Sequence, residues 1–577
     1  MSFHEARVRR GSAFLPPRSV QDRARPDRTE APDPGGTAPG QGGVGQLLPL
    51  PFPPHRGRQP RRDHQHDQQL CGGGAAAARG REAGEAPAHP RAQDGAARAP
   101  AGAGARAHQR QGLGVAAPAL ASSAQVDEAL AARGLQSVLA PARRAGADAV
   151  AALLQDLAGV DWELLDRQRA ALAAPPPAAP CPLEPPELLP PPARATPENE
   201  AAARRGWEAL RAGRVAVATV AGGQASRLGF DAPKGTFPLA PVSGASLFQM
   251  LAGQVRRLRE LSGAALPWII QTGPENHADT HRFLERHNWF HLRRDSVLLV
   301  CQGTLPALSA DGQLLLAAPD RLFRNPDGHG GFYAALSGSG ALAELRRRGV
   351  DTLFSCQVDN ALVRMGDPVF LGHHLGRGAD MSAKVVEKTD PGEKVGMLAR
   401  CGGRHVVLEY SDLPPELAAR RAADGSLLYR AGNIAIHAFT LSFVEAMAGA
   451  QLPLHLARKK VRALDAGGQP VERDAVKFET FVFDAMPLAR CVAVQLVERD
   501  EEFAPLKNRD GVDSIRTARE ALDRRARRWC AAALPQLRLA EHGWVEIEPG
   551  LAYDAADLRS RAGEVELVAC GRLLRRR

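Results

Sequence analysis

The chain has 577 residues, which allows roughly two to four domains, and its formal net charge is +10. Residues 1–120 hold 17 arginines, no lysine and 10 acidic residues, so the remainder is nearly neutral and the charge is no evidence for nucleic-acid binding. No apolar run is long enough to span a membrane. The eight cysteines show no CxxC or metal-ligand spacing, which favours buried, reduced thiols in a cytoplasmic protein over disulfides or zinc.

Residues 1–122 are rich in Ala, Gly, Pro and Arg and show no apolar periodicity. A segment of this composition cannot bury enough apolar surface to offset its chain entropy, so we predict a disordered extension. The composition changes abruptly near Ser122, which also suggests the hypothesis of a mis-called start, with translation beginning downstream of Met1. The intact mass of the native protein tests that hypothesis.

Residues 123–212 are predicted to form an N-terminal helical region. Apolar residues recur at helical spacing over residues 126–172. The proline-rich segment Pro175–Pro192 follows as a stiff, extended spacer. A further helix is expected over Glu198–Ala212, immediately before the next region.

Val215–Gly235, with the sequence VAVATVAGGQASRLGFDAPKG, is the most informative segment of the chain. Its β-branched beginning predicts a buried strand, which breaks at Gly222-Gly223 into a turn followed by Arg227 and Lys234. Because glycine has no Cβ, backbone N–H groups in such a turn can approach an anion closely. The spacing matches neither a P-loop nor a GxGxxG turn. We therefore predict a phosphate-binding loop of another kind, in which the two cations neutralise a triphosphate.

Lysine is scarce, since only eight of the 74 basic residues are lysines. A planar guanidinium substitutes poorly for a compact ammonium at a phosphate, so the lysines that remain are candidates for chemistry. They are Lys234, Lys384, Lys388, Lys394, Lys459, Lys460, Lys477 and Lys507. For Lys388, Lys459 and Lys460 an ordinary surface role is an equal alternative.

Residues 213–500 are predicted to form an α/β catalytic domain, because strand-like runs alternate with helical stretches. The expected strands after the first are Pro267–Gln271, Ser296–Cys301, Thr352–Val358, Ala383–Glu387 and Asn433–Phe439. The expected helices are Leu247–Leu261, Ala278–Arg286 and Gly331–Arg348. The C-terminal region, residues 501–577, begins with a predicted helix over Asp513–Ala533 and ends in short apolar alternations that suit a small β-rich appendage.

Four further motifs follow predicted strands or open predicted helices: Gln302–Ala307, Asn325–Gly331, Cys356–Asn360 and Pro505–Asn508. The second is a glycine-dense loop that opens a helix, where a ligand can approach the backbone. The third places Asp359 at the carboxyl end of a strand, where open α/β sheets hold their ligands.

Together with Val385–Lys388, Glu409–Ser411, Ala431–Ala435 and Lys477–Glu479, these motifs occur in an order that resembles the eukaryotic-type UDP-sugar pyrophosphorylases. The phosphate loop resembles that family's signature, G-G-x-G-T-R-L-x(n)-P-K. The resemblance covers about Val126–Tyr553 and is strongest to the UDP-N-acetylglucosamine (hexosamine) branch. It implies a GT-A-like (Rossmann-like) nucleotidyltransferase that converts UTP and a sugar 1-phosphate into a UDP-sugar and pyrophosphate.

The resemblance also implies a role for each motif residue, in a reaction that needs positioning and charge neutralisation but no covalent nucleophile. The implied nucleotide-binding residues are Val220, Ala221, Gly222, Gly223, Gln302, Gly328 and Asp359, and Asp359 would also bind Mg²⁺. The implied catalytic residues, which contact the phosphates, are Arg227, Lys234 and Lys507. The implied substrate-binding residues are His329, Glu409, Asn433 and Lys477.

Several of these residues also have ordinary structural explanations. Asp359 could cap a helix, His329 could be a simple turn residue, and Gln302 could satisfy backbone groups at a strand end. Glu409 could be an unremarkable strand terminus, so the sugar contacts are the least specific part of the assignment.

Two departures from the family pattern bear on activity and on the sugar. Ala225 replaces the second loop glycine and fits without about 1 kcal/mol of strain only if its φ is negative. His329 stands where the hexosamine enzymes carry Asn and is similar to the glucose-using relatives, whereas Glu409 and Asn433 follow the hexosamine branch. The favoured acceptor is N-acetylglucosamine 1-phosphate, with glucose 1-phosphate as the alternative.

Two other classes of function compete with the enzyme. A non-catalytic UDP-sugar or UTP binder would result if Ala225 disabled the loop. A nucleic-acid-binding protein could use the arginine-rich N-terminus, but that segment lacks interleaved aromatic residues. The expected partners are therefore UTP and a sugar 1-phosphate, without nucleic acid or membrane, and the sequence does not indicate an oligomeric state.

Overall fold

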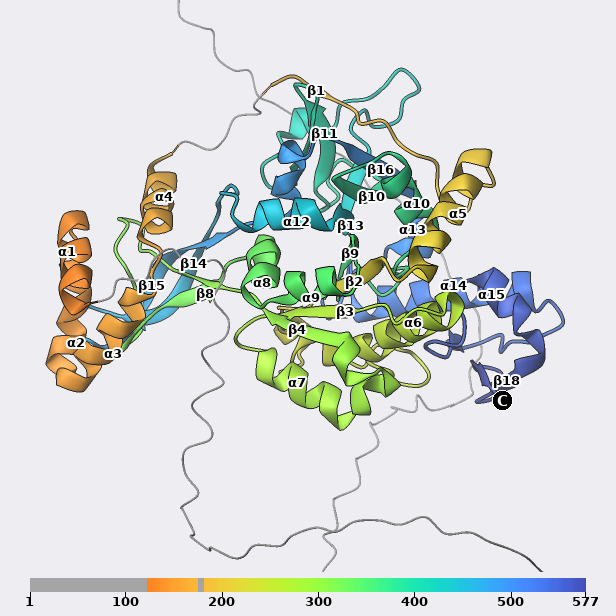
Figure 1. Ribbon diagram of the computed structural model, residues 1–577, viewed down its shortest axis with the longest axis horizontal. Helices are drawn as coiled ribbons and strands as arrows, with labels where there is room; N and C mark the ends of the chain where they lie inside the picture. Colours follow the sequence, from red (N-terminus) through yellow and green to blue (C-terminus); the bar gives the residue numbers. More distant parts are fainter. Residues whose placement is uncertain (1–121, 175–180) are drawn as a thin grey trace, which may run out of the picture. The chain divides into compact units, whose positions relative to one another are not determined.

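The computed structural model describes residues 122–174 and 181–577 (Figure 1). The predictions made for residues 1–121 and 175–180, including the state of Cys71, lie outside this part of the chain. Among the described residues, no helix is long and apolar enough to cross a membrane.

The described chain begins with four helices where the apolar spacing predicts them: α1 (Ser123–Arg133), α2 (Leu139–Ala145), α3 (Ala147–Ala158) and α4 (Trp162–Ala173). The hydroxyl of Ser122 accepts a hydrogen bond from Gln125 N at the start of α1, and Asp161 caps α4 in the same way. Their buried leucines pack with Leu308 and Phe478 in one apolar cluster. The helices are therefore anchored to segments that lie far along the sequence.

The described end of the proline-rich segment is paired, which corrects its prediction as a spacer. Strand β1 (Leu183–Glu184) pairs antiparallel with β11 (Met397–Cys401). Leu189 N donates to Val494 O, at 2.8 Å, on strand β16 (Val492–Val497). The segment is extended as predicted, but it extends the edge of a sheet.

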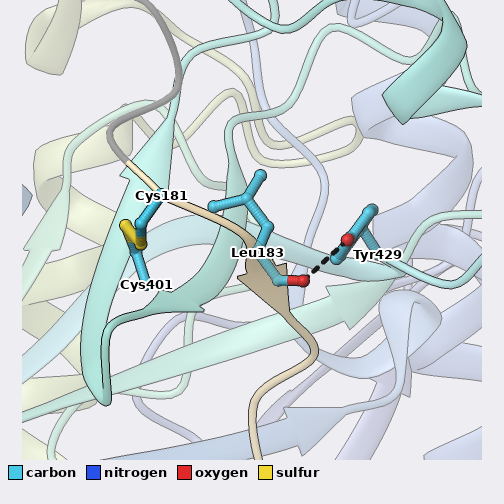
Figure 2. The surroundings of a disulfide bond; sticks show 4 residues. All are labelled: Cys181, Leu183, Cys401 and Tyr429. Carbon is cyan, nitrogen blue, oxygen red and sulfur yellow. Dashed lines mark hydrogen bonds between the residues drawn. A yellow bond between two sulfur atoms is a disulfide. The ribbon is translucent and has the colours of Figure 1, made fainter.

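A disulfide fastens the same segment, and the prediction of reduced cysteines is wrong for this pair. Cys181 and Cys401 are bonded, with their Cα atoms 5.7 Å apart. Figure 2 shows the neighbouring contact, in which the Tyr429 hydroxyl donates to Leu183 O at 2.9 Å. The spacing of the sequence missed this pair because the two cysteines meet only through the pairing of β1 with β11. The free cysteines among the described residues are Cys301, Cys356, Cys491, Cys530 and Cys570.

A mixed α/β sheet forms the centre of the described chain, as the alternation of elements predicts. Among the described residues it has ten strands, seven of which follow the order β1-β11-β13-β9-β2-β3-β4. Strands β9 (Thr352–Gln357), β2 (Val215–Val220), β3 (Trp268–Thr272) and β4 (Val297–Cys301) run parallel. Strand β13 (Ala431–Thr440) is antiparallel to β9 and also pairs with β10 (Met381–Glu387), which continues to β16; β12 (Arg404–Leu408) pairs with β11.

Both faces of the sheet are covered because successive residues of β2 point to opposite sides. Val215 and Val217 pack with α5 (Pro197–Arg211), α6 (Leu247–Ser262), α7 (His277–Arg286), α10 (Pro368–Gly376) and α14 (Ile515–Ala533). Ala216 and Ala218 pack with α8 (Phe332–Gly338), α9 (Ala341–Arg347) and α12 (Leu441–Ala448). Figure 1 shows α6 and α7 on the side of β3 and β4 opposite to α8 and α9. A strand that is buried on both faces reads as a continuous apolar run, as observed here.

Two predicted helices differ from the structure. The expected helix Gly331–Arg348 is divided into α8 and α9, because Gly340 has a φ of 75° and interrupts the turn between them. The helix expected from Asp513 begins at Ile515, since Asp513 has a φ of 53° and Ser514 caps the first turn.

Several short or peripheral elements were not predicted from the sequence. The hairpin β14 (His455–Leu464) and β15 (Pro470–Glu479) carries part of the surface that the N-terminal helices cover. Pairs β5 (Thr304–Pro306) with β8 (Arg324–Pro326), and β6 (Leu316–Ala318) with β7 (Arg321–Leu322), lie beside it. The other unpredicted elements are the short helices α11 (Pro415–Ala418), α13 (Arg499–Glu502) and α15 (Ala555–Ser560). The sheet of β17 (Glu546–Ile547), β19 (Leu573–Arg576) and β18 (Val565–Val568) lies in the C-terminal region, where the apolar alternations favour short β-strands.

Candidate functional site

The carboxyl ends of the four parallel strands meet at one edge of the sheet, and the predicted motifs follow those ends. Ala221 N donates to Gln271 O at 2.7 Å, which joins the ends of β2 and β3. Val358 N donates to Val220 O at 3.0 Å, immediately before Asp359. Gln302 N likewise donates to Thr272 O at 2.9 Å. This edge is where open α/β sheets place ligands.

The predicted phosphate loop is closed on itself by backbone hydrogen bonds. Lys234 N donates to Gly223 O at 3.1 Å, and Ala225 N donates to Ala232 O at 3.0 Å. Ala225 is buried with a φ of −97°, so alanine fits the position without the strain that a positive φ would impose. The negative φ of Ala225 therefore gives no physical reason for this substitution to disable the loop.

The tip of this loop presents unpaired donors. Among the hydrogen bonds of the described residues, none uses the backbone N–H of Gly222, Gly223 or Gln224. Arg227, in the short 3-10 turn Ser226–Leu228, is exposed and likewise has no hydrogen-bond or ion-pair partner in the described chain. Consecutive free N–H groups, followed along the chain by an unpaired guanidinium, are suited to bind an anion.

Gln302 lies directly against the glycine turn. A Cβ added to Gly222 would come within 2.6 Å of Gln302 Oε1, so the close approach requires glycine. Gln271 Nε2 donates to the same oxygen at 3.0 Å, which orients the Gln302 amide and leaves its Nε2 group free to donate. The two predicted nucleotide-binding residues are thus in contact.

Lys234 and Asp359 form an ion pair across the site, with Nζ 3.3 Å from Oδ2 and side-chain exposures of 18% and 14%. Leu506 N donates to Asp359 O at 2.9 Å, and Asn360 pairs with Pro505. These contacts bring the backbone that precedes Lys507 next to Asp359, while Lys507 Nζ lies 3.7 Å from Asp513 Oδ2. Asp359 caps no helix, so its alternative explanation is not supported.

The glycine-dense loop Asn325–Gly331 packs closely against residues Glu479–Val482. Gly328 has a φ of 85°, and a Cβ there would collide with Thr480 O. Gly330 N donates to Thr480 O at 2.8 Å. The neighbouring Asp327 carboxyl lies between Gly303 and Gly331, and burial raises the pKa of Asp327 to about 7. These glycines are therefore required by close contacts within the protein.

His329 is fixed in one orientation by its neighbours. Its Nδ1 accepts a hydrogen bond from Val482 N at 3.0 Å, and its ring stacks on Phe481 with centroids 4.9 Å apart. Burial lowers the pKa of His329 to about 4, so the ring is neutral at pH 7. Because Nδ1 is the acceptor, the proton resides on Nε2 and makes that atom a donor.

Glu409 and Asn433 meet around Gly396. Asn433 N donates to Gly396 O at 2.8 Å, and Glu409 Oε1 lies 3.2 Å from where a Cβ on Gly396 would be. Burial raises the pKa of Glu409, against the opposing influence of His455 and Lys507.

Two of the candidate lysines stand apart from this cluster. Lys477 Nζ lies 5.5 Å from the centre of the Phe323 ring, and no hydrogen bond or ion pair of the described residues joins it to another predicted site residue. Lys384 is fully buried, with Nζ 2.7 Å from Asp367 Oδ2 and 2.6 Å from Glu502 Oε2. Lys384 therefore belongs to a buried cluster of charges with a structural role.

The donor set for a metal ion is small. Among the described residues there is no group of three His, Cys, Asp or Glu side chains that could hold a metal. Asp359 Oδ1 has no hydrogen-bond partner in the described chain and remains available as a single carboxylate ligand. Mg²⁺ is commonly held by one or two carboxylates together with substrate phosphates and water, so the residues present fit that ion.

Two further residues at this edge escaped the sequence analysis. Asn276 is buried beneath the glycine turn and hydrogen-bonds to it, and the Gly273-Pro274 pair after β3 is the signal that could have pointed to a turn there. Arg509 Nη1 lies 3.7 Å from where a Cβ on Gly229 would be, which adds a cation beside the loop. No motif of the sequence distinguishes Arg509 from the many other arginines.

Comparisons with known proteins find a matching family and similar structures. Residues 189–524 match the family described as UTP–glucose-1-phosphate uridylyltransferase. The human UDP-N-acetylhexosamine pyrophosphorylase-like protein 1 is 40% identical over 429 residues, which cover 70% of this chain and 84% of that protein. The Saccharomyces cerevisiae UDP-N-acetylglucosamine pyrophosphorylase is 34% identical over 378 residues, covering 63% and 79%. The crystal structure of the Trypanosoma brucei uridine diphosphate N-acetylglucosamine pyrophosphorylase has a TM-score of 0.66 and 25% identity, covering 77% of this chain and 95% of that one.

Proposed function

The chain belongs to the UTP–glucose-1-phosphate uridylyltransferase family, and we propose that it transfers UMP from UTP to a sugar 1-phosphate, releasing pyrophosphate. The observation that carries the proposal is the row of unpaired N–H groups at Gly222–Gln224 beside Arg227 and Lys234. We assign a GT-A-like catalytic domain to residues 213–500. The C-terminal region, residues 501–577, contributes Lys507 and ends in the small three-stranded sheet as a β-rich appendage.

N-acetylglucosamine 1-phosphate is the favoured acceptor. The human relative is named for N-acetylhexosamine and the yeast relative for N-acetylglucosamine. The family description names glucose 1-phosphate instead, which keeps that sugar as the alternative. His329 supports either acceptor, because its Nε2 donor can meet an acetamido carbonyl or a hydroxyl oxygen.

The mechanism follows from charge and position. The free N–H groups and Arg227 hold the triphosphate, and the Gln302 amide meets the uracil. A phosphate oxygen of the sugar phosphate attacks the α-phosphorus in line, and negative charge accumulates on the departing pyrophosphate. We assign the neutralisation of that charge to Lys234, which is paired with Asp359, and to Lys507, and the orientation of the sugar to Glu409 and Asn433.

Asp359 is the residue that would hold Mg²⁺, which supplies further neutralisation of the phosphates when it is bound. The Asp359 carboxylate is paired with Lys234. This pairing keeps the lysine at the site and compensates both partly buried charges, so neither Lys234 nor Asp359 is an isolated charge.

The test is pyrophosphate release from UTP with the 1-phosphates of N-acetylglucosamine, N-acetylgalactosamine, glucose and galactose. We expect release with the N-acetylated sugars, and a loss of about 100-fold or more in kcat/KM for Lys234→Ala. Lys460→Ala is the matched control, because Lys460 pairs with Glu472 on the exposed face of β14. Preference for glucose 1-phosphate would establish the alternative acceptor. Absence of release with every sugar would overturn the proposed reaction.

A further inference from the structure

We propose that Asn276 is a positioning residue that aims the phosphate-binding N–H groups of the Gly222–Gln224 turn. The inference rests on the proposed function of that turn and extends it to a side chain outside the loop. Asn276 lies between β3 and α7 and is 0% exposed. It therefore acts through the loop and does not touch the nucleotide.

The Asn276 amide forms hydrogen bonds with two carbonyl groups of the turn. Its Nδ2 group donates to Ala221 O at 3.0 Å and to Gly223 O at 3.2 Å. Its Oδ1 atom accepts a hydrogen bond from Gly273 N at 2.8 Å, which fixes the amide in turn. Each polar atom of the Asn276 side chain is thus engaged, and each contact lies within ordinary hydrogen-bond distance.

Because the peptide bond is planar, a hydrogen bond that fixes a carbonyl group also fixes the direction of the N–H group in the same peptide. Ala221 C=O and Gly222 N–H belong to one trans peptide, as do Gly223 C=O and Gln224 N–H, so each pair points in opposite directions. Holding the two carbonyls against Asn276 turns the two N–H groups to the opposite side of the turn. Those are two of the donors that have no partner in the described chain.

The position of Asn276 in its own helix supports a dedicated role. It is the residue that precedes the first turn of α7, where an asparagine side chain usually accepts a hydrogen bond from its own helix. No such bond forms at α7, because the side chain is directed to the glycine turn. Lys234 N also holds Gly223 O, but among the described residues Asn276 is the one group that donates to Ala221 O.

Asn276→Asp tests the proposal with almost no change of shape. Aspartate keeps the acceptor for Gly273 N, loses both donors, and sets carboxylate oxygens against two carbonyl oxygens. We expect the KM for UTP to rise about tenfold or more, and the affinity for inorganic pyrophosphate to fall likewise. The KM for the sugar 1-phosphate should stay within about twofold of wild type, because the groups around Gly396 are untouched. Asn276→Ala should show a smaller rise, since it removes the donors without adding the repulsion.

Asn199→Asp is the matched control. Asn199 is also buried, and its Nδ2 group also donates to two backbone carbonyls, Pro191 O and Arg194 O, each at 2.8 Å. The same substitution there removes the same number of hydrogen bonds at a site remote from the loop. It should lower the melting temperature while leaving the KM for UTP unchanged.

The split between KM and kcat separates positioning from stability. If Asn276 only supported the fold, Asn276→Asp would reduce the amount of active protein and lower kcat with an unchanged KM for UTP, and that result would overturn the proposal. Direct calorimetric titration of UTP in the absence of sugar tests the same point without turnover. Inactivity of the wild type with weakened UTP binding in Asn276→Asp would refute the reaction but sustain the positioning role, whereas equal UTP binding by the two proteins would refute the role itself.

Discussion

Asp327 shows how a single residue can couple the candidate site to pH. Its Oδ1 atom is buried without a hydrogen-bond partner, and burial raises its pKa to about 7 from the ordinary value of 3.8. The unfolded chain therefore binds fewer protons than the native protein between those two values. The free energy of unfolding must fall as the pH rises through this window, by at most about 1.4 kcal/mol per pH unit.

Asp327→Asn should abolish that dependence, because an amide does not titrate. Urea unfolding of both proteins at pH 5, 6, 7 and 8 measures it. The wild type should lose stability relative to the variant from pH 5 to 7, and the difference should be constant above about pH 8. Parallel profiles for the two proteins would show that the Asp327 carboxyl stays ionised in the fold.

The sequence predicted those site residues whose backbone conformation or charge is itself the signal. Gly222 must be glycine because Gln302 lies against it, and Lys234 and Asp359, each singled out for its charge, form an ion pair at the strand ends. Asn276 and Arg509 could not be found in this way, because their importance arises from a contact with a loop distant in sequence. Lys384 was misleading because the scarcity of lysine pointed to phosphate binding, whereas this lysine is required by a buried ion pair.

At the scale of elements, the disulfide joins a strand edge to a segment that would otherwise be held by few contacts. Cys181 and Cys401 are separated by 220 residues along the sequence. A cross-link that closes a long loop removes entropy chiefly from the unfolded chain. Strand β1 itself has only two residues, so its own pairing contributes little.

Cys181→Ser should therefore lower the free energy of unfolding by about 2–4 kcal/mol. Denaturant unfolding with and without dithiothreitol measures the effect, and the reductant should destabilise the wild type but not the variant. Cys570→Ser is the control, because Cys570 is an exposed free thiol. An equal response of wild type and Cys181→Ser to dithiothreitol would contradict the prediction.

The long elements could be predicted because their periodicity is a local property. The parallel strands and helices α6 and α7 occur within one or two residues of the expected bounds. The apolar pattern of a strand buried on both faces, or of an amphipathic helix, is visible within the segment itself. The hairpin of β14 and β15 could not, because its strands carry runs of charged residues such as Arg458–Lys460 and are ordered by the N-terminal helices that pack on them. The division of α8 from α9 depends on the single positive φ of Gly340.

On the scale of the whole molecule, the buried cluster of Lys384, Asp367 and Glu502 connects parts of the chain that are distant in sequence. Asp367 caps the start of α10, Lys384 lies on β10 and Glu502 ends α13, and all three side chains are buried. Glu502 O also accepts a hydrogen bond from Asn360 Nδ2 at 2.7 Å, next to Asp359. The cluster is therefore joined by one hydrogen bond to the residue that follows Asp359.

Lys384→Met should destabilise the protein by roughly 3–5 kcal/mol, because it removes the ammonium group that both buried carboxylates contact and leaves only the guanidinium of Arg364, 3.9 Å from Asp367 Oδ1, beside them. Guanidinium unfolding measures this loss. The triple variant Lys384→Met, Asp367→Asn, Glu502→Gln should recover much of it, since the uncompensated charges are then gone. A triple variant less stable than Lys384→Met would show that the remaining hydrogen bonds of the cluster outweigh its charges.

The backbone contact between Leu506 and Asp359 has a consequence for the timing of synthesis. A ribosome adds about 5–20 residues per second, so Lys507 emerges roughly 15–60 s after the glycine turn near residue 222. A nascent chain can already have folded its parallel strands while it still lacks that lysine and the segment that braces Asp359. The proposed site is thus completed only when most of the polypeptide has left the ribosome, and a chain released early would carry the loop without the chemistry.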